Sequence, residues 1–131
     1  MVTDLDGETH TLEAYQGRVL VLHFWASWCP YCRSEISELR ELQQQWTSKD
    51  VRVMAVSTDQ DLETLKRFIA QQRLPYPVIA DVEQESSLSD QYGVSGIPVT
   101  YVIGRDGRIA ERLNGASEII ETVQRVLKGS S

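Results

Sequence analysis

Apolar residues along the chain form continuous runs that alternate with stripes of helical spacing. The runs Arg18–Trp25 and Val51–Ser57 are almost entirely apolar, which is typical of central strands covered on both faces. Val99–Ile103 predicts another strand, and Val78–Ala80 predicts a short extended piece. Because these runs have strand length and are separated by helical patterns, they predict an α/β fold.

Apolar positions three and four residues apart predict the helices. Pro30–Lys49 is expected to be the longest helix, and Asp61–Gln72 the next, with Thr58 or Asp59 in its N-cap region. Ser117 is expected to cap a last helix. The predicted inner faces of the three helices hold Ile36, Leu39, Leu42, Trp46, Leu62, Leu65, Phe68, Ile69, Ile119, Ile120, Val123, Val126 and Leu127.

Turn signals complete the order of elements. Asp6-Gly7 predicts a hairpin between two short strands, and 105–108 predicts a tight turn into a strand over 109–113. Leu12–Tyr15 is expected to form a helical turn, and Ser86–Tyr92 a short helix that ends at Gly93. The order β-β, β-α-β-α, β-β-α predicts a parallel pair with a right-handed crossover and a late antiparallel hairpin. We expect residues 1–131 to form a single domain.

Composition excludes several classes of function. The chain has 131 residues, 41% hydrophobic and 24% charged, a net charge of −6 and a pI of about 4.9. An acidic surface argues against nucleic acid and anionic membranes as partners. No run of about 18 apolar residues occurs, so we expect no membrane insertion by these residues. The opening Met1–Asp4 lacks the basic and apolar regions of a signal peptide.

The only two cysteines, Cys29 and Cys32, stand where the first central strand meets the longest predicted helix. At the helix N-terminus, unpaired N–H groups and the helix dipole favour the thiolate form of Cys29. Cys29 is therefore the candidate exposed nucleophile, and Cys32, one turn inward, the candidate resolving thiol. Attack by Cys29 on a disulfide gives a mixed disulfide, which Cys32 then resolves.

Other interpretations of the cysteine pair remain open. A structural disulfide would close so short a loop that it restrains the unfolded chain very little. A zinc site needs about four ligands, and only His10 and His23 are available to supplement the cysteines. Chance spacing of two buried cysteines is a further alternative. Pro30-Tyr31 between the cysteines also occurs in glutaredoxins, but the flanking tryptophans do not fit that group.

The segment around the cysteines resembles the thioredoxin superfamily motif; it reads Phe24-Trp25-Ala26-Ser27-Trp28-Cys29-Pro30-Tyr31-Cys32-Arg33. More narrowly, the chain is similar to the TlpA/ResA/CcmG-like thiol–disulfide oxidoreductases, which are extracytoplasmic bacterial proteins. Further matches lie in 5–20, 74–93, 92–100 and 105–109. The resemblance implies a thioredoxin fold with an N-terminal β-hairpin and a central insertion, its mixed sheet flanked by helices.

The resemblance also implies a substrate site. It places a cis peptide at Ile97-Pro98 beside the cysteines, with the Ile97 backbone turned toward an extended substrate. Trp28 and Pro98 would wall the site, together with Pro30 and Tyr31. The alternative is that Pro98 simply begins a strand. We expect no cofactor other than a redox-active Cys29–Cys32 disulfide, and no metal.

Three residues are candidates for a proton relay. His23 stands where thioredoxins carry a buried Asp and this branch often has Asn. A histidine there either moves a proton to or from Cys32 or is hydrogen-bonded in the core. The carboxylates Asp59 and Glu35 are weaker acid–base candidates, more typical of a cap and a solvated helix residue. Ser37 replaces a helix proline usual in the family, which predicts a less kinked helix.

The leading functional hypothesis is a monomeric reductase of protein disulfides. The resemblance implies electrons from a membrane thiol transporter and substrates such as apocytochrome c during cytochrome c maturation. The alternatives are a disulfide-forming oxidant and a non-enzymatic binding or copper-handling module.

The implied location is extracytoplasmic or periplasmic, with a signal or anchor outside these residues; a cytoplasmic location is the alternative. The chain opens inside the expected first hairpin, which suggests a piece of a longer exported or anchored protein or of a larger enzyme, such as a methionine sulfoxide reductase fusion.

Overall fold

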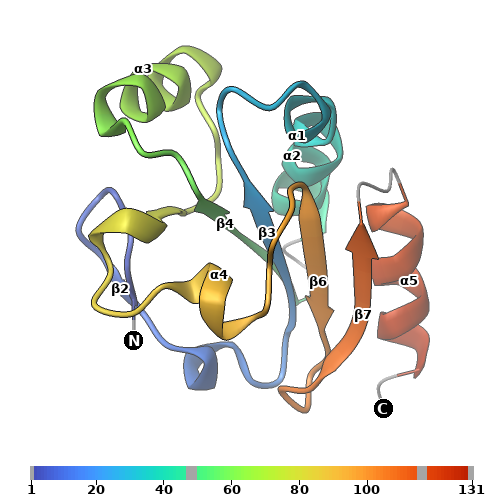
Figure 1. The fold of residues 1–131 in the computed structure, drawn as a ribbon. Helices are drawn as coiled ribbons and strands as arrows, with labels where there is room; N and C mark the ends of the chain where they lie inside the picture. Colours follow the sequence, from blue (N-terminus) through green and yellow to red (C-terminus); the bar gives the residue numbers. More distant parts are fainter. Residues whose placement is uncertain (1, 47–49, 115–117, 130–131) are drawn as a thin grey trace.

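A five-stranded sheet forms the centre of the computed structural model, which describes residues 2–46, 50–114 and 118–129. The strand order is β5-β4-β3-β6-β7 (Figure 1). The bounds are β3 Val19–Trp25, β4 Val51–Ser57, β5 Val78–Ala80, β6 Val99–Ile103 and β7 Ile109–Asn114. β4 is parallel to both β3 and β5, whereas β6 is antiparallel to both β3 and β7. The predicted parallel pair and late hairpin are confirmed.

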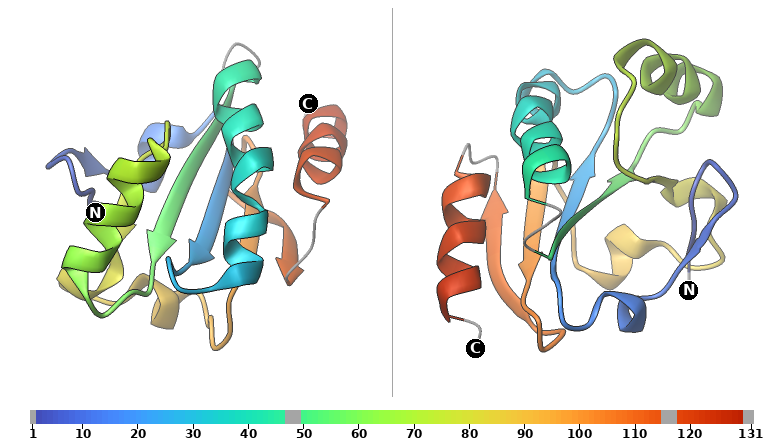
Figure 2. Two further views of the ribbon diagram at one scale, coloured as in Figure 1. Left: turned by 90° about the horizontal axis from the view of Figure 1, so that it is seen from above. Right: turned by 180° about the vertical axis from the view of Figure 1, so that it is seen from behind.

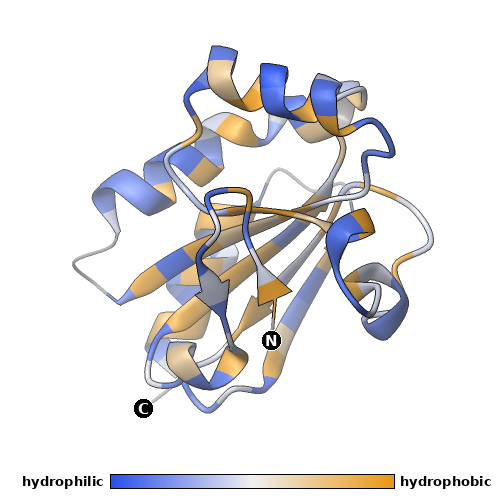
Figure 3. Cartoon of the chain, turned by 90° about the vertical axis from the view of Figure 1, so that its left-hand side faces the viewer, coloured by the Kyte–Doolittle hydropathy of each residue, from blue (hydrophilic) through white to orange (hydrophobic). Residues whose placement is uncertain are grey.

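Every residue of β3 is buried, because both faces of the sheet are covered. One face packs against α1 (Pro30–Ser34), α2 (Ile36–Gln45), α3 (Leu62–Gln72) and α5 (Ile119–Gly129) (Figure 2). The other face meets η1 (Leu12–Tyr15), α4 (Leu88–Gln91) and the β1–β2 hairpin. Figure 3 shows hydrophobic colour along the central strands and mixed colours on the helices. The continuous apolar run in the sequence reflects this two-sided burial.

The predicted continuous helix Pro30–Lys49 is wrong. It is divided at Glu35, which ends α1 and precedes α2. The Glu35 N–H bonds back to the carbonyl of Cys32 at 3.2 Å, so the chain tightens into a turn before the helix resumes. α2 ends at Gln45, and Lys49 lies outside the described residues. That Ser37 leaves this helix less kinked than the usual proline would stays a prediction.

Helix α3 begins where a different residue provides the cap. Asp61 accepts hydrogen bonds from the N–H groups of Glu63 and Thr64, so the predicted cap at Thr58 or Asp59 is wrong. Because the Asp61 side chain satisfies two otherwise unpaired donors, it fixes the helix start. The predicted cap Ser117 of the last helix lies outside the described residues.

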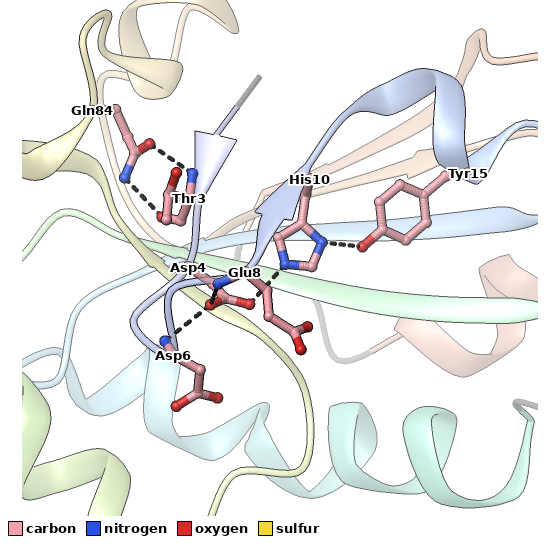
Figure 4. A network of polar contacts seen from close by, with 7 residues as sticks. All are labelled: Thr3, Asp4, Asp6, Glu8, His10, Tyr15 and Gln84. Atoms are coloured by element: carbon pink, nitrogen blue, oxygen red, sulfur yellow. Dashed lines mark hydrogen bonds and ion pairs between the residues drawn. The ribbon is translucent and has the colours of Figure 1, made fainter.

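The N-terminal hairpin joins β1 (Val2–Thr3) to β2 (Thr9–His10) as predicted, with Gly7 in the turn at φ 87°. Asp4 fastens its two strands (Figure 4): Oδ1 accepts the N–H groups of Asp6 and Glu8, and Oδ2 lies 2.7 Å from His10 Nε2. Burial opposes ionisation of Asp4, but the contacts with His10 and the hydrogen bonds from the backbone of Glu8 and Asp6 together outweigh it and lower the pKa of Asp4.

The central insertion runs from β5 through the 3₁₀ turn η3 (Asp81–Glu83) to α4. Asp81 is buried, and its carboxylate accepts from the backbone of Leu88 and from the hydroxyl groups of Ser87 and Ser89. This arrangement ties α4 back to the end of β5. None of the helices in the described residues has the length and apolar character that a membrane span needs.

Candidate functional site

The cysteines lie in the link between β3 and α1. Cys29 is the N-cap of α1, Pro30 follows it, and the Cys29 Sγ accepts the N–H of Cys32 at 3.2 Å. Pro30 has no N–H, and at this helix position none would be bonded. Both cysteines are free thiols. The helix start therefore directs a backbone donor at the sulfur of Cys29, which stabilises negative charge there.

The expectation that Cys29 is exposed is wrong. Cys29 is only 4% exposed, although Cys32 is buried further, at 0%. Trp28, immediately before the pair, is 67% exposed. A disulfide therefore reaches Cys29 only through the small part of its surface that is exposed. The side chain of Tyr31, a predicted substrate contact, lies outside the described residues.

The second predicted wall lies on the loop before β6. The peptide bond Ile97-Pro98 is cis, and Pro98 is buried. Because Val99 pairs with Phe24 of β3, Pro98 lies level with Trp25, at the end of the strand that leads to the cysteines. A groove of about 440 Å³ borders this loop, lined by Ser95, Gly96, Ile97, Pro98, Val99, Arg112 and Asn114. An extended segment of a partner fits a groove of this kind.

His23 and Glu35 meet beneath the cysteines. The Nδ1 atom of His23 lies 2.8 Å from the Thr100 Oγ1 and 3.6 Å from the Glu35 Oε1. Burial lowers the pKa of His23 to about 3, so the imidazole is neutral at ordinary pH. The contact with Glu35 is therefore between a neutral ring and a carboxyl group. His23 is therefore a neutral core residue that is hydrogen-bonded to Thr100.

The expectation that Glu35 is solvated is wrong, because the residue is only 4% exposed. Burial, followed by the charge of Glu38, raises its pKa to about 7. Burial, followed by the hydrogen bond with Cys29, raises the pKa of the Cys32 thiol well above its usual range. Negative charge on Glu35 adds to that shift. Glu35 and Cys32 therefore resist ionising together, so one proton is favoured on the pair.

Comparison with known proteins places this site in a family. Residues 1–112 match the AhpC/TSA family. The chain belongs to the AhpC/TSA family. Among curated members of similar sequence, thiol-disulfide oxidoreductase ResA of Bacillus thuringiensis (strain Al Hakam) is 32% identical over 115 residues, covering 88% of this chain and 65% of the relative. ResA of Bacillus cereus (strain ATCC 10987 / NRS 248) is 30% identical over 128 residues, covering 98% and 72%.

A putative thiol:disulfide interchange protein DsbE from Chlorobium tepidum has a similar solved structure. Its TM-score is 0.84 at 27% identity, over 96% of this chain and 90% of that one. The thioredoxin fold and the resemblance to ResA-like and CcmG-like oxidoreductases are confirmed. The chain spans about two thirds of the length of the ResA relatives, 65% for the one from Bacillus thuringiensis.

Asp59 serves this AhpC/TSA-family site as a support and not as a helix cap. It is 2% exposed, and its carboxylate accepts the Ser27 N–H at 2.9 Å and the Ser27 Oγ–H at 2.6 Å. Ser27 belongs to the loop between β3 and Cys29. Asp59 therefore fixes the path of the backbone that delivers the cysteines.

We expect Asp59→Ala to lower the free energy of unfolding by about 2–3 kcal/mol. The change leaves two buried donors of Ser27 without a charged acceptor. Urea unfolding followed by circular dichroism measures the loss. Asp61→Ala is the matched control: it removes an exposed cap and should cost clearly less than Asp59→Ala. Equal losses in the two variants would contradict the supporting role of Asp59.

Among the residues that the structure describes, the only cluster with metal-ligand geometry is Asp4, Glu8 and His10, whose ligand atoms lie within 4.8 Å of one another. The oxygens of Asp4 already accept two backbone N–H groups and face the His10 ring. These contacts hold the two strands of the hairpin together, which explains why the three residues cluster. Cys29, Cys32 and His23 do not form such a cluster, which argues against the zinc interpretation.

The sequence did not predict two features of the site: the burial of Glu35 and the hydrogen bond between Ser27 and Asp59. Glu35 stands three residues after Cys32 and four before Leu39, so helical spacing already placed it on the buried face. Its charge led to the opposite prediction. The bond between Ser27 and Asp59 joins residues 32 positions apart, and no local pattern in the sequence indicates it.

Proposed function

We propose that the chain is a thiol–disulfide oxidoreductase that reduces protein disulfides through Cys29 and Cys32. The observation that carries the proposal is the position of Cys29 as N-cap of α1, with its sulfur accepting the Cys32 N–H. That geometry stabilises a thiolate one turn away from a second, more deeply buried thiol. A nucleophile and a resolving group at this separation are what disulfide exchange needs.

The reaction has two displacements. The Cys29 thiolate attacks one sulfur of the substrate disulfide, forming a mixed disulfide and releasing the other sulfur as a thiolate. Cys32 then loses its proton and attacks the Cys29 sulfur, closing the Cys29–Cys32 disulfide and releasing the second substrate thiolate. Two electrons pass from the dithiol to the substrate, and the released thiolates take up protons. An external dithiol donor restores the reduced pair.

Glu35 is the proposed acceptor of the Cys32 proton. Its pKa of about 7 lies near neutrality, where a general base is most effective. His23 is proposed as a positioning residue, since its neutral ring touches both Thr100 and Glu35. Asp59 is left as a structural support of the loop.

Substrate contact is proposed for Trp28, Pro30, Tyr31, Ile97 and Pro98. Trp28 offers a large exposed ring immediately before Cys29 in the chain, and aromatic side chains contribute strongly to protein contacts. The backbone of Ile97 would pair with the extended substrate segment.

We also propose an extracytoplasmic location, a membrane thiol transporter as electron donor, a role in cytochrome c maturation and a monomeric state. Their support is the resemblance to ResA-like and CcmG-like proteins. The acidic net charge of −6 supports a protein partner over a nucleic acid.

The direction of reaction is tested by comparing two rates under the same conditions. The reduced protein is mixed with a disulfide-bonded peptide, and the oxidised protein with the same peptide as a dithiol. We expect the first reaction to be faster and to proceed nearly to completion. A faster and more complete second reaction would instead identify an oxidant, and no exchange in either direction would exclude an oxidoreductase.

We expect His23→Asn to shift the inflection in the pH profile of the resolving step by about half a unit or more. Asn is shorter than His, so the polar ring that lies 3.6 Å from the Glu35 Oε1 is lost and the surroundings that set the Glu35 pKa change. Stopped-flow measurement of mixed-disulfide decay from pH 5 to 9 records the shift. Thr100→Ser, which keeps the hydroxyl group, should leave the inflection in place. An unchanged profile with reduced stability would leave His23 as a core residue only.

A further inference from the structure

Helices α2 and α3 cover the same face of the sheet (Figure 2), and a groove lies between them. It measures about 430 Å³ and is lined by Arg33, Ile36, Ser37, Arg40, Phe68 and Gln72. We call it the α2–α3 groove. Its lining combines two cationic side chains with an apolar floor and contains no carboxylate.

Both guanidinium groups of the groove are held in place by α3. The Cζ of Arg33 lies 5.0 Å from the centroid of the Phe68 ring, within range of a cation–π contact. Arg40 donates to the backbone carbonyls of Gln72 and of Arg73, at the C-terminal end of α3. Because their positions are fixed before any partner arrives, little side-chain entropy is lost on binding.

No carboxylate in the described residues pairs with the positive charge in the groove, although the carbonyls at the C-terminal end of α3 offset part of the charge of Arg40. Among the described residues, neither Arg33 nor Arg40 forms an ion pair with a carboxylate. The nearby Glu38 lies toward the last helix, where its Oε1 is 3.5 Å from the Ile120 N. Two fixed cations without counter-charges are unexpected on a chain of net charge −6. Local positive potential of this kind attracts anionic groups.

The lining of the groove begins with the residue that follows the cysteine pair. Arg33 directly follows Cys32 and stands four residues after Cys29, a rise of about 6 Å along a helix. Arg40 lies seven residues further, on α2 beyond the turn at Glu35. Phe68 also packs against Trp25, with ring centroids 5.6 Å apart, which ties the floor of the groove to the end of β3. A chain segment bonded to Cys29 can therefore continue into the groove.

We propose that the α2–α3 groove binds an acidic segment of the protein whose disulfide is exchanged, with carboxylates on Arg33 and Arg40 and apolar side chains on Phe68 and Ile36. Guanidinium groups pair with carboxylates by two parallel hydrogen bonds, which gives direction as well as attraction. The inference rests on the proposed function, because the segment must belong to a disulfide-bearing partner. The groove then selects among partners that the cysteines alone would treat alike.

Two disulfide-bonded peptides test the inference. They are identical except that one carries two Asp residues three to six positions from its cysteine and the other carries Asn there. At low salt we expect kcat/KM for the acidic peptide to exceed that for the neutral one by about tenfold. Arg33→Glu should reduce this ratio to about one or below. Lys66→Glu, the same charge change on α3 outside the lining of the groove, should keep it within about twofold of the unchanged protein.

The ratio separates this inference from the proposed function. If both peptides are reduced at equal rates, the groove does not select acidic segments, although the oxidoreductase activity stands. If neither peptide reacts, the proposed function itself fails. If Lys66→Glu lowers the ratio as much as Arg33→Glu, general charge explains the preference and the groove is excluded. Raising the salt concentration should reduce the ratio, because the Arg–carboxylate pairs are partly exposed.

Discussion

Replacing Cys29 by Ser abolishes disulfide exchange, with kcat/KM falling by at least about 10³-fold. A hydroxyl group in this position is not ionised near neutrality and cannot form a disulfide. The measurement is the release of peptide thiol from a disulfide-bonded peptide, with a thiol reagent as the reporter.

Replacing Cys32 by Ser has a different expected result. Cys29 still attacks, but no thiol remains to resolve the product, so a mixed disulfide on Cys29 accumulates. Mass spectrometry of the intact protein should show an adduct of one peptide strand on Cys32→Ser and none on Cys29→Ser. An adduct on Cys32 in the Cys29→Ser variant would reverse the assigned roles. The lower exposure of Cys32, 0% against 4% for Cys29, is the physical reason to expect this order.

Glu35→Gln should slow the decay of the mixed disulfide by about 10²-fold at pH 8. The carboxyl group has a pKa of about 7, so it is ionised and able to accept the Cys32 proton only above that pH. In the unchanged protein the rate should therefore rise through about pH 7, and Gln should remove this inflection. Stopped-flow fluorescence of the neighbouring tryptophans follows the decay.

Glu38→Gln is the matched control for Glu35. Its pKa is also raised, chiefly by burial, but its carboxylate faces Ile120 and not the cysteines. It should change the rate by less than about threefold. A similar loss in both variants would indicate a general effect of charge on α2 and contradict the role of Glu35.

Glu35→Gln should make the protein more stable at pH 8, although it slows the reaction. The pKa of Glu35 rises from its usual 4.5 to about 7 on folding, so between these values the unfolded chain releases a proton that the folded protein keeps. Stability is therefore lost as the pH rises from about 4.5 to 7. Gln removes that loss, which is on the order of 2–3 kcal/mol at pH 8. A variant that is slower yet more stable at pH 8 than the unchanged protein cannot owe its slow rate to misfolding.

Periodicity located the strands well because burial on both faces leaves a continuous apolar signal. β3 and β4 lie where their apolar runs predict them, and Val78–Ala80 forms β5. The helix Pro30–Lys49 was predicted less well. The apolar stripe that predicted it begins at Ile36, after Glu35, so the pattern does not mark the turn that divides α1 from α2.

The sequence predicted which residues form the candidate site, but it did not predict how deeply they are buried. The two cysteines, His23 and the loop at Pro98 were identified from the motif and the resemblance. The burial of Cys29 and Glu35 was not, because it depends on how the loop after β3 and the start of α2 pack against the sheet. The partner of Asp59 lies 32 residues away in the chain, and only the parallel pairing of β3 with β4 brings the two together.

The central claim is that Cys29 and Cys32 cycle between dithiol and disulfide as a reducing couple. Its most direct test is equilibration of the protein in dithiothreitol or glutathione buffers of graded potential, followed by alkylation and mass spectrometry. We expect a single two-electron transition on Cys29 and Cys32, at a potential nearer to about −270 mV than to about −120 mV. A potential near −120 mV would contradict the reductase assignment, and a pair that never cycles would contradict the proposed activity altogether.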